Sequence, residues 1–321
     1  MVNIKDIAKA ANVSAATVSN VIHGKVNVGD ETREKVLALC KQMNYRPNIS
    51  ARNLKTGKTN TVMFVFSDFQ RGFYLHIING INDYLLENGL SMIVCTHTSL
   101  RNFLHTGFVD GAIVLDAHLQ DADLLSVAGP SLPLVMMDRV LDSPYISSVV
   151  TDNNSSMEPL VRRLTERGYR SFCYVGGIAH TRDHMERYEC FRRVLAEQRI
   201  PFSNEQYYQG DYSIDSGTRV GSILAVGGNL PEAVVCANDH MAAGLVSAME
   251  ERGINVPAQL AVTGFDGETI PALSKGFLTT AVIPRYEMGY LAAETLVAMM
   301  RKKSGREVRR IAAPMRIGVS A

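Results

Sequence analysis

Strand-like apolar runs alternate with amphipathic helical runs over most of this 321-residue chain. TVMFVF at 61–66 is followed by the helical pattern of 73–89 and then by the strand-like LSMIVCT at 90–96. The alternation continues as far as LAVTGFD at 260–266. Because parallel strands need helical crossovers, this pattern predicts parallel α/β sheets. The strands are too many for one small sheet, so we expect two doubly wound lobes with a ligand cleft at the carboxyl ends of their strands.

The first 46 residues follow a different pattern, in which three short helices are predicted. The apolar residues of the first helix recur with helical spacing at Ile4, Ile7, Ala8 and Ala11. Ser14 is a good N-cap for a second helix that ends near residue 23, and a third helix is predicted from about Asp30 to Asn44. The apolar face of the third helix would be Val36, Leu37, Leu39, Cys40 and Met43. Two short helices joined by a tight turn and followed by a third indicate a helix-turn-helix unit.

The predicted second helix is unusually small on one side. Its sequence, VSAATVSNVIH at 13–23, places Ser, Ala and Thr side chains opposite the apolar Val18 and Val21. Small side chains let a helix backbone approach base edges in the major groove, and hydroxyl groups can reach bases or phosphates. This face therefore favours DNA binding, with a plain three-helix bundle as the alternative.

Charge is distributed unevenly along the chain. Residues 1–58 hold ten Lys and Arg against four Asp and Glu, a net charge of +6. The remaining residues hold 23 basic against 28 acidic side chains, a net charge of −5. A basic head on a slightly acidic body favours a polyanionic partner for the head. A solvated basic surface would give the same charge count.

The segment YRPNISARNLKTGKTN at 45–60 predicts a short hinge helix. Pro47 ends the third helix, and Asn48 can cap a new helix that runs to about Lys55. So short a helix is marginal alone in water, and we expect it to form on a DNA surface. Arg52 and Lys55 would meet phosphates, and Leu54 would act as an apolar wedge in the minor groove. An ordinary interdomain linker is the alternative.

Several other classes of protein fit the sequence poorly. The chain has 46% hydrophobic residues, but its N-terminus has no signal-peptide core and no run of about 18 apolar residues occurs, so we expect a cytoplasmic protein without a membrane partner. The cysteines lack CxxC spacing and are expected to be reduced: Cys40, Cys95, Cys173, Cys190 and Cys236. His180 and His184 could mimic a helical metal pair, but no HExxH, phosphate loop or GxSxG is present. We predict no enzyme activity, no cofactor and no metal site.

Motifs along nearly the whole chain resemble those of the lactose-repressor (LacI/GalR) family of bacterial transcription regulators. They are IKDIAKAANVSAATVSNVIHG, DETREKV, NYRPNISARNLKTGKT, FVDGAIVL, PLVMMDR, ANDHMAAGL, VTGFDG and LTTAVIPRYEMGYLAAETL, in the order found in the family. The resemblance implies a helix-turn-helix domain at 1–46, a hinge helix and linker at 47–59, and an effector-binding and dimerisation domain at 60–321. The effector domain would resemble periplasmic sugar-binding proteins. Its N-lobe would comprise about 60–150 and 284–309, and its C-lobe about 151–283 and 310–321.

The resemblance further implies a homodimer that binds a pseudo-palindromic double-stranded operator. The main base-reading positions of the family correspond to Ala15, Ala16 and Asn20, and its phosphate or groove-edge positions to Ser14, Thr17, Ser19, Thr32, Tyr45 and Asn48. Paired hinge helices would lie in the central minor groove, with Leu54 as the intercalating residue and Arg52 and Lys55 beside it.

A small molecule in the cleft, a sugar or a sugar derivative, would control the affinity for DNA. By resemblance the effector-binding residues are Phe73, Tyr74, Asp138, Thr181, Asp183, Arg187, Tyr212, Asn238 and Asp266. Aromatic faces together with carboxylate, amide and guanidinium groups suit a polyhydroxylated ring, since carboxylate and guanidinium groups can each hold two hydroxyls. Core packing is the alternative role for the aromatic residues, and a turn or loop-capping role is the alternative for Asn238 and Asp266.

The sequence departs from the family pattern at four places. Asn20 stands where the family most often has Arg, and Asn prefers adenine to guanine. Gly29 replaces the usual Ser cap of the third helix. Segment 96–108 has 13 residues, too few for the helix usually found there, which puts a dimer or partner surface in doubt. Cys190 replaces a Gly, and either adds bulk near Arg187 or is a small buried hydrophobe.

The predicted function is therefore a sequence-specific transcriptional regulator of a sugar-utilisation operon, in the role of a repressor. One alternative stays open at this point. A global catabolite regulator would have the same architecture but would be controlled by a phosphorylated carrier protein.

Overall fold

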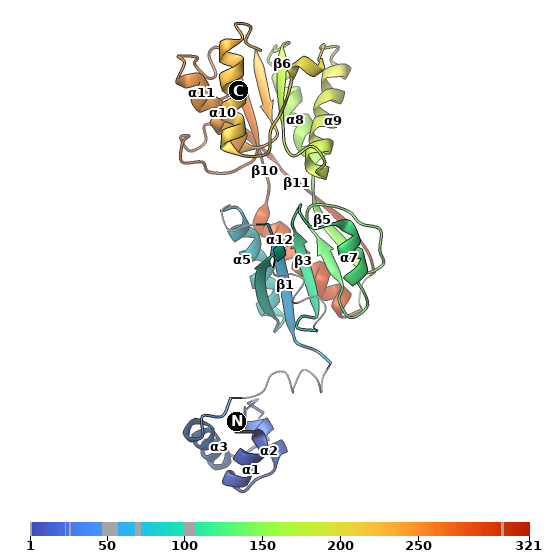
Figure 1. Ribbon diagram of the computed structural model, residues 1–321, viewed down its shortest axis with the longest axis vertical. Helices are drawn as coiled ribbons and strands as arrows, with labels where there is room; N and C mark the ends of the chain where they lie inside the picture. Colours follow the sequence, from blue (N-terminus) through green and yellow to red (C-terminus); the bar gives the residue numbers. More distant parts are fainter. Residues whose placement is uncertain are drawn as a thin grey trace. The chain divides into compact units, whose positions relative to one another are not determined.

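The computed structural model describes residues 2–22, 24–25, 27–46, 57–67, 72–98, 107–302 and 305–321. The chain divides into two compact units, Met1–Thr59 and Asn60–Ala321 (Figure 1). The predicted hinge residues Asn48, Arg52, Leu54 and Lys55 lie outside the described residues, as does most of the shortened segment 96–108.

The first unit is a three-helix domain, as the helix-turn-helix pattern predicts. Its helices are α1 (Ile4–Ala11), α2 (Ala15–Ile22) and α3 (Asp30–Gln42). Their buried residues form one small core: Ile7, Ala8, Ala11, Val18, Val21 and Val36. The Ser14 hydroxyl accepts a hydrogen bond from the Thr17 amide at 3.0 Å, which confirms Ser14 as the cap of α2. The prediction is wrong for Leu37, which is 49% exposed because it lies one position beyond the buried stripe of α3.

The N-lobe of the second unit is a six-stranded parallel sheet covered by helices. Its strands are β1 (Thr61–Phe66), β2 (Ser91–Thr96), β3 (Gly111–Leu115), β4 (Leu134–Met136), β5 (Ile146–Asp152) and β11 (Val308–Ala312). Its helices are α5 (Tyr74–Glu87), α7 (Asp121–Val127) and α12 (Arg285–Met300). The strand order is β11-β5-β4-β3-β1-β2, so the last strand of the lobe comes from near the end of the chain.

The C-lobe repeats this plan. Its strands are β6 (Phe172–Gly176), β7 (Tyr207–Gln209), β8 (Ala233–Cys236), β9 (Ala261–Asp266), β10 (Thr279–Val282) and β12 (Met315–Arg316). Its helices are α8 (Asn153–Glu166), α9 (Arg182–Glu197), α10 (Ile214–Val226) and α11 (Asp239–Glu250), with the short 3₁₀ helix η1 (Asn204–Gln206). The strand order is β12-β10-β9-β8-β6-β7, and only the β10–β12 pair is antiparallel among the described strands.

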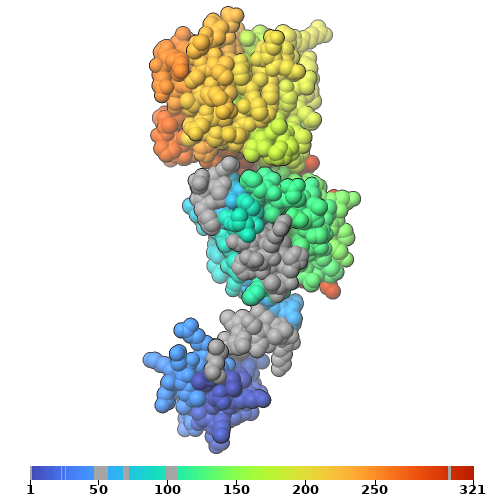
Figure 2. Space-filling model, viewed as in Figure 1, coloured from blue at the N-terminus to red at the C-terminus, as the bar shows by residue number. Residues whose placement is uncertain are grey.

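Both sheets are doubly wound, which confirms the predicted fold class. In each lobe the chain starts inside the sheet, adds one neighbour on one side and then continues on the other, as β2-β1-β3-β4-β5 and β7-β6-β8-β9-β10. Ligands of such sheets bind beyond the carboxyl ends of the strands at this reversal. The chain passes between the sheets three times, after β5, after β10 and after β11. In Figure 2, cyan to green covers most of the visible N-lobe and yellow-green to orange covers most of the C-lobe.

Glycines allow the closest helix contacts in both lobes. A methyl group on Gly80 of α5 would overlap the backbone oxygen of Tyr286 on α12, and one on Gly289 of α12 would overlap that of Ile77 on α5. The two helices therefore touch backbone to backbone through a reciprocal pair of glycines. The C-lobe repeats the arrangement between α10 and α11, at Gly217 and Gly244.

We expect Gly80→Ala to destabilise the N-lobe by about 3 kcal/mol. The overlap is with backbone rather than with a flexible side chain, so α5 and α12 would have to separate along their whole contact. The gain in helix propensity, about 1 kcal/mol, offsets only part of this cost. Urea unfolding followed by circular dichroism measures the change, with Gly129→Ala as the control, since no atom lies within 4 Å of a methyl group at that position. Equal stability of the two variants would contradict this account of the contact.

Candidate functional site

The first candidate site is the exposed face of α2. Val18 and Val21 are buried in the core of the domain, which leaves Ser14, Ala16, Thr17, Ser19 and Asn20 at or near the surface. Ala15 is half-buried and packs partly against the core. The predicted groove-edge residues Thr32 and Tyr45 are also half-buried. The helix therefore presents a face of small polar and apolar side chains, as the sequence predicts, with Ala15 at its margin.

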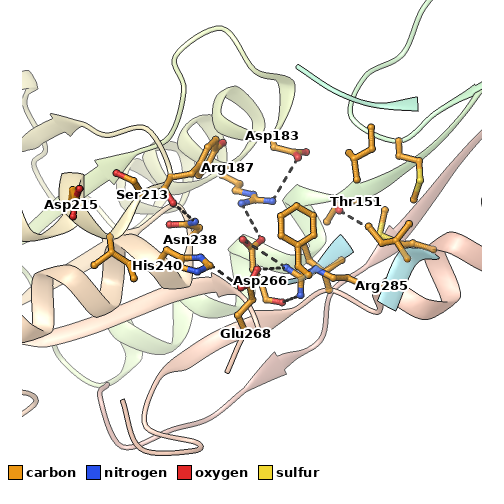
Figure 3. Close-up of a pocket in the computed structure, with 18 residues that line it drawn as sticks. Thr151, Asp183, Arg187, Ser213, Asp215, Asn238, His240, Asp266, Glu268 and Arg285 are labelled. Carbon is orange, nitrogen blue, oxygen red and sulfur yellow. Dashed lines mark hydrogen bonds and ion pairs between the residues drawn. The ribbon is translucent and has the colours of Figure 1, made fainter. Parts of the chain in front are cut away.

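The second candidate site consists of two cavities that share four residues. One cavity has a volume of about 440 Å³ and the other of about 540 Å³, and Phe73, Leu115, Asp183 and Tyr212 line both. The first contains the predicted effector residues Arg187, Asn238 and Asp266 (Figure 3), and the second contains Tyr74, Asp138 and Thr181. All nine predicted effector-binding residues therefore lie around one two-part cavity that draws on both lobes.

Arg187 lies at the centre of the first cavity, held from α9. Its side chain is 3% exposed, and its guanidinium group lies 3.7 Å from the centroid of the Phe265 ring. Nε donates to the Oδ1 atom of Asn153 at 2.8 Å, and Nη1 donates to the backbone oxygen of Ala237 at 2.7 Å. Burial alone would lower the pKa of Arg187, but Asp183 and Asp266 nearby raise it overall. The result is a fixed buried cation, able to bind a carboxylate, a phosphate or two hydroxyl groups.

Asp266 lies between two arginines that come from different lobes. Its carboxylate is 3.7 Å from Arg187 of the C-lobe and 3.9 Å from Arg285 of the N-lobe. Burial raises the pKa of Asp266, and the two arginines oppose this shift. The residue ends β9 with φ of 111°, a backbone conformation that costs energy for any residue other than glycine. Such strain is typical of a side chain held in place for binding.

Arg285, the first residue of α12, is a cavity residue that the sequence analysis missed. Its Nη1 atom donates to the backbone oxygen of Asp266 at 2.8 Å, and Nη2 donates to Glu268 at 3.1 Å. Its guanidinium group also lies 5.0 Å from the ring centroid of Phe73. A cation is disfavoured in the first turn of a helix by the helix dipole, so an Arg directly after Pro284 was a signal that acidic partners lie nearby.

Asp138 places a buried carboxyl group in the wall of the second cavity. Its Oδ2 atom accepts two hydrogen bonds from Arg139, at 2.8 and 3.2 Å. Its Oδ1 atom is buried and has no hydrogen-bond partner among the residues that the structure describes. Burial raises the pKa of Asp138 to about 6, although Arg139 opposes the shift. A buried acceptor without a donor is costly, and a ligand hydroxyl group would satisfy it.

The aromatic residues of the cavities come from the start of α5 in the N-lobe and from the loop before α10 in the C-lobe. Phe73 and Tyr74 begin α5, with ring centroids 4.0 Å apart. Tyr212 has a φ of 70°, and its ring packs on Gly177 so closely that no side chain would fit there. Burial raises the pKa of Tyr212 to about 12, and its hydroxyl lies 3.3 Å from the Thr181 hydroxyl. These rings are therefore fixed walls of the cavity.

Two of the predicted residues have clear structural roles. Asn238 caps α11, since its Oδ1 atom accepts from the Met241 amide at 2.9 Å, and its Nδ2 atom donates to the Tyr212 backbone at 3.0 Å. Asn238 therefore has a capping role, at a helix rather than at a turn or loop, and it also lines the cavity. Thr181 caps α9 through a hydrogen bond from the His184 amide. Cys190 is buried in the C-lobe core and does not line either cavity, which favours the reading as a small hydrophobe.

Other findings bear on the classes that the sequence disfavours. The five cysteines, all of which the structure describes, are free thiols. None of the helices among the described residues has the length and apolar character needed to cross a membrane.

Two family models match the chain. A model described as bacterial regulatory proteins of the lacI family matches residues 3–48, which contain α1, α2 and α3. A model of a periplasmic binding protein-like domain matches residues 161–319. The matches agree with the division into a helical head and a two-lobed domain.

Individual proteins match over almost the full chain. Catabolite control protein A of Priestia megaterium is 30% identical over 311 residues, 94% of each chain. The probable HTH-type transcriptional repressor ExuR of Bacillus subtilis (strain 168) is 28% identical and covers 94% of this chain and 92% of its own. Among solved structures, the transcriptional regulator CelR in complex with cellobiose has a TM-score of 0.75 at 26% identity, with full coverage of both chains. The Lac repressor bound to ONPG has a TM-score of 0.84 at 24% identity, over 100% and 99% of the two chains, and supports the fold.

Proposed function

The chain belongs to the lacI family of bacterial regulatory proteins, and on this basis we propose that a sugar or sugar derivative in the two-part cavity controls its binding to operator DNA. The protein is a DNA-binding transcriptional repressor of this family, with the head formed by α1, α2 and α3 as its DNA-binding domain. The sugar acts from the cleft between the lobes and changes their relative orientation. A repressor acts on chromosomal DNA, which agrees with the cytoplasmic location expected from the sequence.

Operator binding is proposed to require a homodimer. The small, exposed face of α2 would enter the major groove of each half-site, with Ala16 and Asn20 toward the bases and Ser14, Thr17 and Ser19 at the groove edge. Two heads on one pseudo-palindrome double the contacts that one head makes. The net charge of +6 on residues 1–58 supports phosphate binding by each head.

The ligand class follows from the chemistry of the cavity. The walls of the cavity combine apolar side chains such as Ile77, Met137 and Met288 with hydrogen-bonding groups and the aromatic rings of Phe73 and Tyr212. The observation that carries the proposal is the buried Oδ1 atom of Asp138, which lines the second cavity and lacks a partner among the described residues. The fixed guanidinium of Arg187 lines the first cavity, and the two cavities share Phe73 and Tyr212. An acceptor and a donor beside Phe73 and Tyr212 match a ring with several hydroxyl groups. The complex of CelR with cellobiose gives independent support for this class.

A thermal-shift screen of sugars, sugar phosphates and nucleosides tests the proposal. A ligand present at about 100 times its Kd stabilises the folded protein by about 2.7 kcal/mol, which is readily seen in the melting temperature. A compound that raises the melting temperature is then tested for a change in operator affinity by fluorescence anisotropy. Stabilisation by nucleosides alone, or by none of the sugars and sugar phosphates, would contradict the proposed ligand class.

We expect the sugar affinity to fall about tenfold between pH 7.5 and pH 5. The ionised Asp138 carboxylate is the form that accepts a hydroxyl, and its pKa of about 6 means that it is mostly protonated at pH 5. Asp138→Asn should bind the sugar more weakly at pH 7.5 and lose most of the pH dependence. Isothermal titration calorimetry at several pH values measures this effect, with the highly exposed Asp142→Asn as the control. An unchanged pH profile in Asp138→Asn would remove Asp138 from the binding site.

Control by a phosphorylated carrier protein is the second candidate function. The match to Catabolite control protein A favours this function, because that relative is 30% identical over 311 residues and its name gives it a role in catabolite control. Capture of cytosolic proteins on the immobilised full chain, with and without phosphatase treatment, separates the two functions. Retention of a small phosphoprotein that tightens operator binding, together with no sugar response, would support the carrier protein as the effector.

A further inference from the structure

Three potential metal ligands meet at the carboxyl edge of the N-lobe sheet, outside the set of predicted effector residues. His97 directly follows β2, and Asp116 and His118 come after β3. These two strands lie on either side of β1. Nδ1 of His97 lies 3.0 Å from Oδ2 of Asp116, and Nδ1 of His118 lies 3.3 Å from Oδ1. One potential ligand atom from each of the three residues lies within 4.8 Å of the others.

These distances suit a tetrahedral metal ion. Zn²⁺ binds imidazole nitrogen and carboxylate oxygen at about 2.0–2.2 Å, which places the ligand atoms of one tetrahedron roughly 3.4 Å apart. The N···O separations of 3.0 and 3.3 Å, which run to the two different oxygens of the Asp116 carboxylate, are each close to that value. Two imidazoles and one carboxylate favour Zn²⁺ and similar transition metals over Mg²⁺ and Ca²⁺, which prefer oxygen ligands.

We propose that His97, Asp116 and His118 bind one divalent transition-metal ion of the zinc class. Three protein ligands leave one coordination position for water or for another small ligand. Asp116 also lines the second cavity, so the metal site borders the proposed sugar site, but metal binding by these three residues does not depend on the proposed sugar function.

Burial and surrounding contacts hold the carboxylate in place for this role. The Asp116 side chain is fully buried, whereas those of His97 and His118 are 33% and 65% exposed, so an ion can reach the group from solvent. The Asp116 Oδ1 atom also accepts from the His118 amide at 2.8 Å, and its backbone oxygen accepts from Arg139 at 2.5 Å. Such outer contacts orient a ligand before the metal arrives.

A purely structural role is the competing explanation. Asp116 would then cap the turn at 116–118, and the two imidazoles would only donate hydrogen bonds to it. The imidazole rings stack with centroids 5.2 Å apart and both present Nδ1 to the same carboxylate. Capping by the His118 amide needs neither imidazole, so the structural role leaves this convergence unexplained. The two explanations differ in whether Zn²⁺ binds in solution.

The test uses the full chain without a histidine tag, stripped of metal with EDTA. Zn²⁺ affinity is measured by competition with a chromophoric chelator, and Co²⁺ serves as a spectroscopic probe of tetrahedral coordination. We expect one Zn²⁺ per chain with micromolar or tighter affinity, and visible Co²⁺ absorption that Zn²⁺ displaces. His97→Gln and His118→Gln should each weaken Zn²⁺ binding at least tenfold, whereas His76→Gln, a change at an exposed histidine of the same lobe, should leave it unchanged.

Melting temperatures measured with and without Zn²⁺ distinguish a loss of metal binding from a folding defect. Without metal, all three variants should melt near the wild-type temperature, because none of these histidines is fully buried. Zn²⁺ should raise the melting temperature of the wild type and of His76→Gln but not of the other two variants. No Zn²⁺ binding in the micromolar range, or equal binding by wild type, His97→Gln and His118→Gln, would overturn the proposal.

Discussion

Arg187→Met is expected to weaken binding of the sugar at least 100-fold while operator binding by the ligand-free protein stays within a few fold of wild type. Arg187 is almost fully buried, and the contacts to Asn153 and Ala237 fix its guanidinium group in the cavity. Removing one partner of a buried charged hydrogen bond costs about 2–5 kcal/mol, and 100-fold corresponds to about 2.7 kcal/mol. Calorimetry measures the affinity, and fluorescence anisotropy on operator DNA measures the response.

Two further variants separate a binding role from a structural one. Arg192→Met removes an exposed arginine of the same helix and should change neither property. Arg187→Lys keeps the charge but not the two-pronged geometry, so it should keep the fold while sugar binding stays weak. Melting curves of the ligand-free proteins check the fold. A full sugar response in a well-folded Arg187→Met protein would show that our assignment of the cavity is wrong.

The fold follows from the sequence because its signals are local. Helical spacing and the Ser14 cap define α1 and α2, and continuous apolar runs define strands such as β1 and β8. No sequence pattern identifies β5, because its ISSVVTD combines two buried serines with valines and has neither alternation nor a continuous apolar run. Burial on both faces of a central strand is a property of the whole sheet, which a short window cannot reveal.

The cavity was predictable only in part. Each effector-binding residue taken from the family pattern lines the cavity, because the position of a motif relative to its strand survives sequence change. Contacts that join the lobes were missed, because Arg285 and Asp266 are 19 residues apart and meet only once β10 crosses into α12. The convergence of His97 with Asp116 likewise depends on the pairing of β2 and β3 on either side of β1, which is not a sequence motif.

Ala16→Asp is expected to lower operator affinity at least 100-fold without unfolding the head. Ala16 is exposed on α2, on the opposite side from the buried Val18 and Val21, so the change leaves the core of the domain intact. If this face enters the major groove, the new carboxylate would lie close to base edges and phosphates, where like charges cost several kcal/mol. Fluorescence anisotropy with operator and random DNA, at a fixed salt concentration, measures both specific and non-specific affinity.

A matched variant separates local repulsion from the change in net charge. Ala38→Asp adds the same charge to the same domain, at an exposed position on α3 away from the predicted groove face. Ala38→Asp should lower operator affinity only a few fold, because it weakens the long-range attraction between the basic head and DNA. Circular dichroism of the two proteins should be the same. Similar losses of operator affinity in Ala16→Asp and Ala38→Asp would mean that α2 does not read the major groove, and that charge alone explains DNA binding by this head.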